Sequence, residues 1–352
     1  MQRCFFKASK SEAYTKRRCV ERQKDQEEIS MALNSRKVAM VGCGFVGSAS
    51  AFALMQSGLF TEMVLIDANH DKAEGEADDI AHGIPFGRPM KIYAGSYDDV
   101  ADAAIIVITA GANQKPDETR LDLVHKNISI FQSIIPEITK RDFGGILLIV
   151  ANPVDILTYT ALKLSGYPEN RVIGSGTVLD SARLKYHLGE HLGVDSRSVH
   201  AFIIGEHGDS EIAAWSSANV SGIPLDKFCE MRGHYNHVQA TERIAEEVKH
   251  SAYEIISKKG ATYYGIAMSV KRICEAIIRD EKSILPISTM MHGEYGISDV
   301  VLSMPCIVGR DGYETKVPID LDQDEVTNLH ESANTLRSVI EDSFKNDDKK
   351  AE

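Results

Sequence analysis

KVAMVGCGFVG, residues 37–47, is the stretch of the sequence that specifies the fold. An apolar run leads directly into a complete GxGxxG pattern, and a helical segment follows. The first glycine, Gly42, permits a tight turn, the second, Gly44, lets the backbone approach a pyrophosphate, and the third, Gly47, allows helix and strand to pack closely. Alone the pattern is weak, because glycine-rich loops also occur without a ligand. After a strand and before a helix, it predicts the start of a dinucleotide-binding unit.

Short apolar runs alternate with helical stretches from Arg36 to about residue 175. Alternation of this kind is typical of βαβ units and predicts an α/β fold with a Rossmann-type, doubly wound parallel sheet. The clearest helix is Arg120–Thr139, in which apolar residues recur at three- and four-residue spacing. Strands are expected at Lys37–Val41, Met63–Asp67, Ile92–Ala94, Ala104–Thr109, Ile146–Val150 and Arg171–Ile173.

The second half of the chain is less regular and predicts an α+β catalytic domain. We expect an apolar strand at Val199–Ile204 and helices at Ser181–Leu192, His234–Lys259 and Asp324–Phe344. The expected domains are therefore 31–174 for the Rossmann unit and 175–352 for the catalytic unit. Residues 1–30 differ in composition and are expected to be a disordered extension or an artefact of start-site choice, with Met31 as the alternative start.

Composition narrows the class of function. The chain has 352 residues, 43% of them hydrophobic, and a net charge of −12, which disfavours nucleic acid or a membrane surface as the partner. A small molecule is the expected partner instead. The six cysteines lie far apart without a CxxC pair, which predicts reduced thiols in a cytoplasmic protein. No structural metal site is expected.

Three further segments fit the cofactor end of an open sheet. Asp67 follows Gly47 by twenty residues, at the end of the second expected strand, where a carboxylate accepts hydrogen bonds from ribose and repels a 2′-phosphate. This position favours NAD over NADP, although a solvated aspartate at a strand end is the alternative. The ends of the fourth and fifth strands, Ala110–Ala112 and Val150–Pro153, are expected to line the same crevice, because carboxyl-end loops do so in such sheets.

The stretch GEHGD, residues 205–209, places a histidine between two glycines after an apolar strand. Imidazole gives and takes a proton near neutral pH, so His207 is a candidate acid and base. A turn with a solvated histidine is the alternative. Two other segments could supply charged groups for catalysis. Asp180 and Arg183 are three residues apart and hence on one helix face. The polar loop of residues 111–120 is suited to be a lid.

From about Arg36 to Phe344 the chain closely resembles the bacterial NAD-dependent L-lactate dehydrogenases within the lactate/malate dehydrogenase family. Five motifs match in order and spacing: GCGFVG, GANQKPDETR, ANPVD, LDSAR and GEHGDS. The resemblance implies that His207 is the proton donor and acceptor and that Asp180 is its partner. It further implies that Arg120 polarises the substrate carbonyl and that Arg183 binds the substrate carboxylate. The structural alternatives are a helix cap for Asp180, a structural ion pair for Arg183 and a solvated helix face for Arg120.

The same resemblance implies the remaining site residues. Asn152 and Thr262 are expected to contact the substrate. The residues expected along NAD are Gly42, Gly44, Val46, Gly47, Asp67, Lys72, Tyr97, Gly111, Ala112, Val150 and Asn152.

Gln114, in the expected lid, bears on the choice of substrate. In the resemblance, lactate enzymes carry glutamine here, whereas malate enzymes carry arginine to pair with a second carboxylate. A neutral side chain leaves the second carboxylate of oxaloacetate unpaired, which costs binding free energy when the site closes. Pyruvate has only a methyl group there and loses no binding free energy. The sequence thus favours interconversion of pyruvate and L-lactate, as in glycolysis and fermentation. A malate or other 2-hydroxyacid dehydrogenase, or a non-catalytic NAD-binding structural protein, is the rival reading.

Two positions depart from the family pattern. Asp117 stands in the lid where glycine is expected. Relatives activated by fructose 1,6-bisphosphate carry an arginine and a histidine at a subunit boundary, and this chain has Lys185 and His200 at the matching positions. Allosteric activation and its absence both remain open, and a homotetramer is expected on family grounds. The pairs His187/His191 and His234/His237 lack a glutamate and a third ligand, so solvated helix histidines are expected there.

Overall fold

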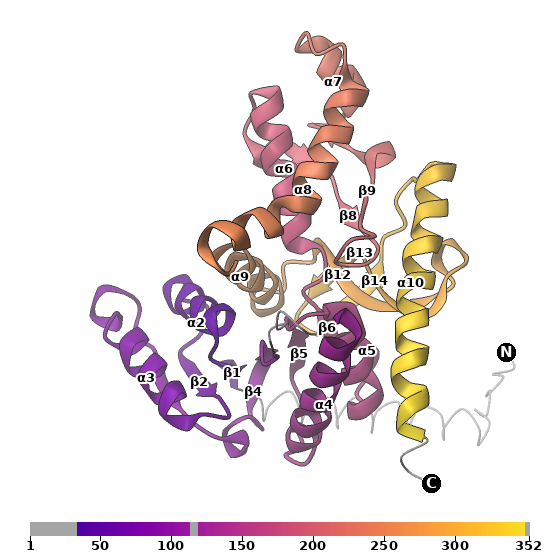
Figure 1. Cartoon of the computed structure of the whole chain (residues 1–352). Coiled ribbons are helices and arrows are strands. Elements are labelled where there is room, and N and C mark those ends of the chain that lie inside the picture. The colour runs from indigo at the N-terminus through magenta and orange to yellow at the C-terminus, as the bar shows by residue number, and fades with distance from the viewer. Residues whose placement is uncertain (1–33, 113–118, 349–352) are drawn as a thin grey trace, which may run out of the picture.

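The computed structural model describes residues 34–112 and 119–348, with side chains given except for Arg120 and residues 344–348. The expected extension 1–30, Gln114 and Asp117 lie outside the described residues. One nine-stranded sheet runs through the described chain, in the order β14-β13-β12-β6-β5-β4-β1-β2-β3 (Figure 1). Helices cover both of its faces, and a smaller group of helices and short strands stands at one end.

The parallel half of the sheet confirms the predicted Rossmann-type fold. Its order, β3-β2-β1-β4-β5-β6, reverses direction between β1 and β4, the switch point at which such sheets bind their ligands. Each expected strand is present with its ends within three residues of the prediction. The strands are β1 (Asn34–Val41), β2 (Glu62–Ile66), β3 (Lys91–Ala94), β4 (Ala103–Ile108), β5 (Ile146–Ile149) and β6 (Val172–Gly174).

Alternate residues of these strands enter two separate cores. In β1, Val38 and Met40 pack with α2, α3 and α9 on one face, whereas Ala39 and Val41 pack with α4, α5 and α10 on the other. A strand buried on both faces is apolar throughout, which explains the run in residues 38–41. The helices are α2 (Phe45–Ser57), α3 (His70–Ala81), α4 (Arg120–Thr139), α5 (Val154–Ser165), α9 (Tyr264–Ile278) and α10 (Gln323–Asp348).

A third core holds the elements that stand away from the sheet. It joins α6 and α8 through buried leucine, isoleucine and valine side chains such as Leu188 and Ile244. The elements are α6 (Val178–Leu192), α7 (Leu225–Met231), α8 (His237–Lys259), β7 (Val199–His200), β8 (Ile203–Ile204), β9 (Ile212–Ala213), β10 (Asn219–Val220) and β11 (Ile223–Pro224).

The expected strand at Val199–Ile204 is two strands. β7 pairs with β10 through His200 and Asn219, and β8 pairs with β9 through Ile203 and Ala213. The two halves therefore belong to different small sheets. The apolar run could not reveal this division, because the division depends on which distant strands are available for pairing.

A long hairpin continues the main sheet on its antiparallel side. It consists of β12 (Ser283–His292), β13 (Ser298–Gly309) and β14 (Gly312–Lys316). Ser288 of β12 pairs with Gly174 of β6, where an added Cβ would lie 2.7 Å from the Ser288 Cβ. The glycine thus permits the close approach that joins the two halves. As a result the predicted Rossmann and catalytic units share one continuous sheet.

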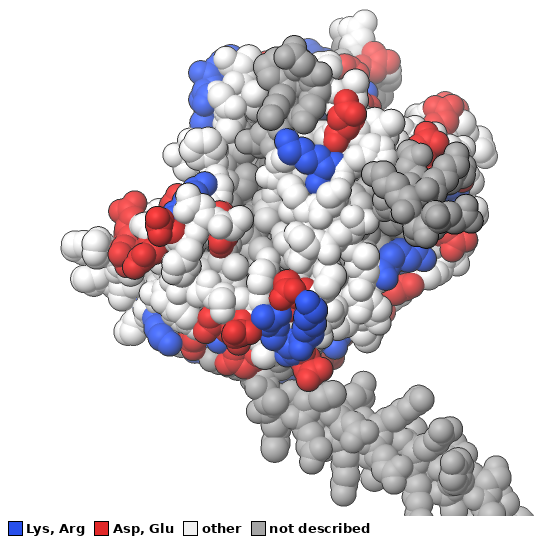
Figure 2. Space-filling view, turned by 60° about the horizontal axis from the view of Figure 1, so that its bottom comes forward, with Lys and Arg blue, Asp and Glu red and all other residues white. Residues whose placement is uncertain are grey.

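The surface of the described chain carries charges of both signs. On the face shown in Figure 2, Lys and Arg lie next to Asp and Glu in small mixed groups among uncharged residues. No helix among the described residues combines the length and the apolar character that crossing a membrane requires.

Candidate active site at the switch point

The glycine loop between β1 and α2 has the geometry that the sequence predicts. Gly42 has a φ of +99°, and a Cβ there would lie 2.5 Å from the Ala110 nitrogen. A Cβ on Gly47 would lie 1.9 Å from the Gly42 carbonyl oxygen, so helix and strand could not pack this closely with any side chain present. A Cβ on Gly44, by contrast, would meet nothing within 4 Å. Gly42 and Gly47 are required by packing, whereas Gly44 borders open space.

The open space lies at the N-terminus of α2, where a dinucleotide pyrophosphate would fit. Gly44 is the N-cap of this helix, no side chain caps it by a hydrogen bond, and its first turn contains no acidic residue. Uncapped N–H groups and the helix dipole favour an anion at this position. The residues present therefore fit NAD, with its pyrophosphate held by this turn.

Alanine substitutions are expected to separate the two glycine roles. Gly47→Ala should destabilise the protein by roughly 2 kcal/mol or more, because its Cβ collides with backbone. Gly44→Ala should leave the melting temperature nearly unchanged and weaken NADH binding by about tenfold or more, because its methyl group occupies the open space. Thermal unfolding and NADH fluorescence titration test both. Equal NADH affinity in Gly44→Ala and wild type would contradict this placement of the pyrophosphate.

Asp67 holds the glycine loop in addition to its expected role. Its Oδ2 accepts a hydrogen bond from the Cys43 N–H at 2.7 Å, and its Oδ1 accepts one from the Asn69 N–H at 2.9 Å. Each carboxylate oxygen retains further acceptor capacity. The carboxylate can therefore fix the loop and accept hydrogen bonds from a ribose.

The other residues expected along NAD lie around the same edge of the sheet. Val46 is half-buried in the first turn of α2, Lys72 is exposed on α3, and Val150 is buried after β5. Tyr97 is partly buried, and burial raises the pKa of its hydroxyl, with smaller contributions from nearby charges that include Asp67. Asp67 and Tyr97 therefore share one neighbourhood.

A buried residue that the sequence reasoning missed joins the ends of two strands. Asn127 of α4 accepts a hydrogen bond from the Ala112 N–H at 2.7 Å and donates one to the Asn152 carbonyl at 2.8 Å. A Cβ on Gly111 would lie 3.5 Å from the same amide oxygen. Asn127 thus holds Gly111, Ala112 and Asn152 together. The signal available in the sequence was a polar asparagine among the apolar positions of the expected helix.

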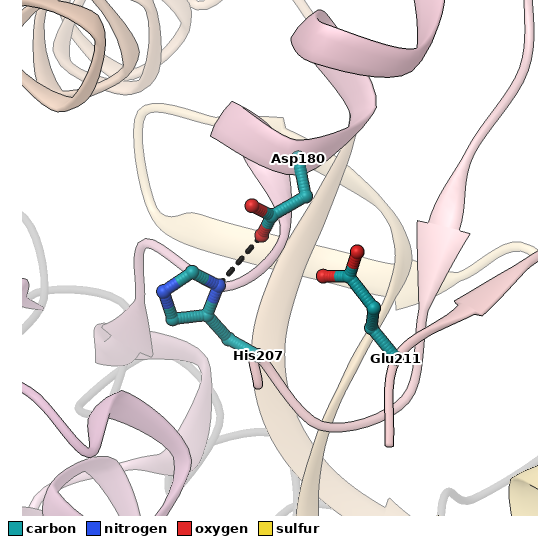
Figure 3. A group of neighbouring side chains, drawn as sticks. All are labelled: Asp180, His207 and Glu211. Atoms are coloured by element: carbon teal, nitrogen blue, oxygen red, sulfur yellow. Dashed lines mark hydrogen bonds and ion pairs between the residues drawn. The ribbon is translucent and has the colours of Figure 1, made fainter. Parts of the chain in front are cut away.

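The chemical end of the site contains a histidine, a carboxylate and a guanidinium. The His207 Nδ1 lies 2.6 Å from the Asp180 Oδ2 (Figure 3). The Arg183 Nη1 lies 2.8 Å from the Asp180 Oδ1. α6 supplies Asp180 and Arg183, whereas His207 comes from the loop after β8. The N-cap of α6 is Thr177, so Asp180 does not cap the helix.

Contacts from distant elements hold the His207 loop. The Asp155 Oδ2 accepts a hydrogen bond from the His207 N–H at 2.7 Å, and its Oδ1 accepts one from the Ser288 hydroxyl at 2.5 Å. Gly205 forms a two-way backbone bridge with Ser303 of β13, each hydrogen bond being 2.9 Å long. Asp155 stands in the ANPVD motif, but the motif by itself indicates no role for this residue. Backbone contacts of this kind leave no periodic signal.

The charges of the pair set its protonation. Burial lowers the pKa of His207, but the negative charge and hydrogen bond of Asp180 outweigh burial and raise it to about 9. Burial of Asp180 would raise its own pKa, yet the charge of His207 and the guanidinium of Arg183 hold that pKa below its usual range. His207 is therefore a protonated imidazolium at neutral pH, with its Nδ1 hydrogen directed at Asp180.

Other expected substrate and effector residues are placed as follows. Thr262 precedes α9, and the next residue, Tyr263, stacks on Phe45 of the glycine loop with ring centroids 5.4 Å apart. Arg120 begins α4, although its side chain is outside the described atoms. Lys185 of α6 lies 5.5 Å from the ring centre of Phe202, and burial lowers its pKa.

His200, the other candidate effector residue, is exposed on β7. Among the histidines expected on helices, the His187 Nδ1 lies 3.6 Å from a Glu247 carboxylate oxygen. The ring of His191 lies 4.3 Å from that of His234, which precedes α8 and is not helical. Over the described residues, one group of three has metal-ligand atoms within 4.8 Å of one another: Asp180, His207 and Glu211. Since Asp180 and His207 already form an ion pair, we interpret these two residues as a pair for proton transfer.

Two models of one protein family match most of the chain. The model of the lactate/malate dehydrogenase NAD-binding domain matches residues 36–174, and that of the α/β C-terminal domain of the same family matches residues 177–347. An L-lactate dehydrogenase of Acetivibrio thermocellus is 55% identical over 305 residues, which is 87% of this chain and 96% of the relative. One of Thermoanaerobacterium saccharolyticum is 53% identical over 304 residues, 86% of this chain and 98% of the relative.

A solved structure also resembles the fold. The minor L-lactate dehydrogenase of Enterococcus mundtii, in its ligand-bound form, superposes with a TM-score of 0.85 at 43% sequence identity, covering 87% of this chain and 98% of that chain.

Proposed function

The chain belongs to the lactate/malate dehydrogenase family, and on that premise we propose that it is an L-lactate dehydrogenase that interconverts pyruvate and L-lactate with His207 as the proton donor and acceptor. It is an NAD-dependent oxidoreductase. The observation that carries the proposal is the His207–Asp180–Arg183 arrangement, which unites an acid with a group suited to a carboxylate. The relatives that are 50–55% identical over nearly their whole length support it.

Each residue has a defined task in this proposal. Bound NADH supplies the hydride. Protonated His207 donates its proton to the carbonyl oxygen of pyruvate, and Asp180 fixes the ring and stabilises the imidazolium. Arg183 grips the substrate carboxylate through two parallel hydrogen bonds. Arg120 opposes the charge that develops on the carbonyl oxygen, and Asn152 and Thr262 complete the substrate site.

The raised pKa of His207 sets an expected pH dependence. Pyruvate reduction needs the imidazolium, so kcat/KM for pyruvate should be nearly constant below the pKa and fall about tenfold per pH unit above about 9. Lactate oxidation needs the neutral ring and should increase over the same interval. Initial rates in both directions from pH 6 to 10 test this. A reduction rate already falling through pH 7 would contradict the assigned ion pair.

The test of the activity is NADH oxidation at 340 nm with pyruvate and, separately, with oxaloacetate. We expect kcat/KM for pyruvate to exceed that for oxaloacetate by about a hundredfold or more, because neutral Gln114 leaves the second carboxylate unpaired. Preference for oxaloacetate would favour the malate alternative. NADH binding without turnover of either substrate would favour a non-catalytic protein.

Further features of the proposal concern assembly, regulation and location. We propose a cytoplasmic homotetramer that acts in glycolysis and fermentation, with Lys185 and His200 as a site for fructose 1,6-bisphosphate. The free, buried thiols of Cys43, Cys229 and Cys274 support a reducing compartment. An activator-dependent decrease in KM would support regulation.

We propose domains 31–174 and 175–352, in keeping with the limits of the two family models.

A further inference from the structure

A third ionisable side chain, Glu211, lies beside the catalytic pair. A carboxylate oxygen of Glu211, a ring nitrogen of His207 and a carboxylate oxygen of Asp180 all lie within 4.8 Å of one another. In Figure 3 the carboxyl group of Glu211, the residue just before β9, points toward Asp180. The close spacing results from a tight turn after His207, in which the Glu211 N–H donates to the Gly208 carbonyl at 3.1 Å.

Glu211 also lines a cavity of about 540 Å³ between this turn, α8 and α10. The other charged residues that line the same cavity are the acidic Asp209, Asp322, Asp324, Glu325 and Glu331 and the cation Lys249. The side chain therefore has the catalytic pair on one side and an acidic cavity on the other. The charged side chains that line this cavity are mostly negative.

Its surroundings favour the protonated form of this carboxyl group at neutral pH. Burial, followed by the charge of Asp180, raises the pKa of Glu211 to about 8, although the cations His207, Arg183 and Lys249 oppose the shift. The groups acting on His207 are the carboxylates of Asp180, Asp155 and Glu211, all of which raise its pKa against the effect of burial. The pKa values of Glu211 and His207 are therefore both raised above neutral pH, and each group acts on the other.

We propose that Glu211, whose carboxyl group lies within 4.8 Å of both members of the His207–Asp180 pair, is a positioning residue that holds the proton on His207 at alkaline pH. This inference rests on the proposed proton-donor role of His207. A neutral Glu211 exerts little effect near pH 7. An ionised Glu211 adds a further negative charge next to the imidazolium, so reduction of pyruvate continues to a higher pH than without it.

Glu211→Gln tests the proposal, because it preserves shape and removes the titration. Its kcat/KM for pyruvate at pH 6 should stay within about twofold of wild type. The alkaline limb of its pH profile should move to lower pH by about one unit, so that kcat/KM on that limb falls by up to about tenfold. Glu211→Asp should restore part of the shift. Glu331→Gln removes a carboxylate that lines the same cavity but does not belong to the close group of Asp180, His207 and Glu211, and it should leave the alkaline limb in place.

A second readout does not need turnover. The His207 ring is titrated by NMR with labelled histidine, and its signal is assigned by its loss in His207→Gln. The ring pKa should fall in Glu211→Gln and not in Glu331→Gln. An unchanged pKa, or an equal decrease in both variants, would overturn the proposal. If wild type fails to reduce pyruvate, the proposed function fails, and this titration still decides the role of Glu211.

Discussion

Replacement of His207 by glutamine is expected to lower kcat for pyruvate reduction by about 10² to 10⁴-fold, the range lost with a general acid. Glutamine can still hydrogen-bond but cannot deliver a proton near neutral pH. The charge of Asp180, 2% exposed, would be left with Arg183 as its remaining partner. Steady-state kinetics with pyruvate measures the loss.

Binding and folding controls make this result specific. NADH affinity should be unchanged within about threefold, because the glycine loop lies on a different element. His250→Gln, which changes an exposed histidine of α8, should retain wild-type kcat. A His207→Gln enzyme with more than about a tenth of wild-type kcat would contradict the assignment of His207 as the proton donor.

The second large effect is expected on substrate choice. Gln114→Arg should change the ratio of kcat/KM for pyruvate to that for oxaloacetate by about 10³-fold or more in favour of oxaloacetate, because the added cation pairs with the second carboxylate and faces only a methyl group in pyruvate. Position 114 lies outside the described residues, so the expectation comes from the lid motif. Parallel NADH-oxidation assays with the two substrates measure the ratio.

A matched control separates local pairing from general electrostatic attraction. Gln239→Arg adds the same charge to an exposed position of α8 and should leave the ratio unchanged within about twofold. If both variants gain oxaloacetate activity equally, the effect is a long-range attraction of a dianion. In that case Gln114 does not select the substrate.

Local sequence patterns determined the parallel half of the fold. Apolar runs predicted the six strands because strands buried on both faces leave no polar positions. The glycine pattern predicted the loop because a φ of +99° at Gly42 and the close contact at Gly47 exclude other residues. Asp180 and Arg183 could be placed on one helix face from the sequence, because residues three apart in a helix lie on the same side.

Only the tertiary structure decided how distant segments complete the site. Asp155 holds a backbone group 52 residues away, Asn127 joins the ends of two strands, and β12 joins β6 through one pair of residues. Such contacts need one partner each and leave no repeating pattern. The shifted pKa values of His207 and Glu211 depend on burial and on neighbouring charges, which exist only once the chain has folded. The sequence by itself therefore determined which residues have suitable chemistry, and the packing decided which of them act together.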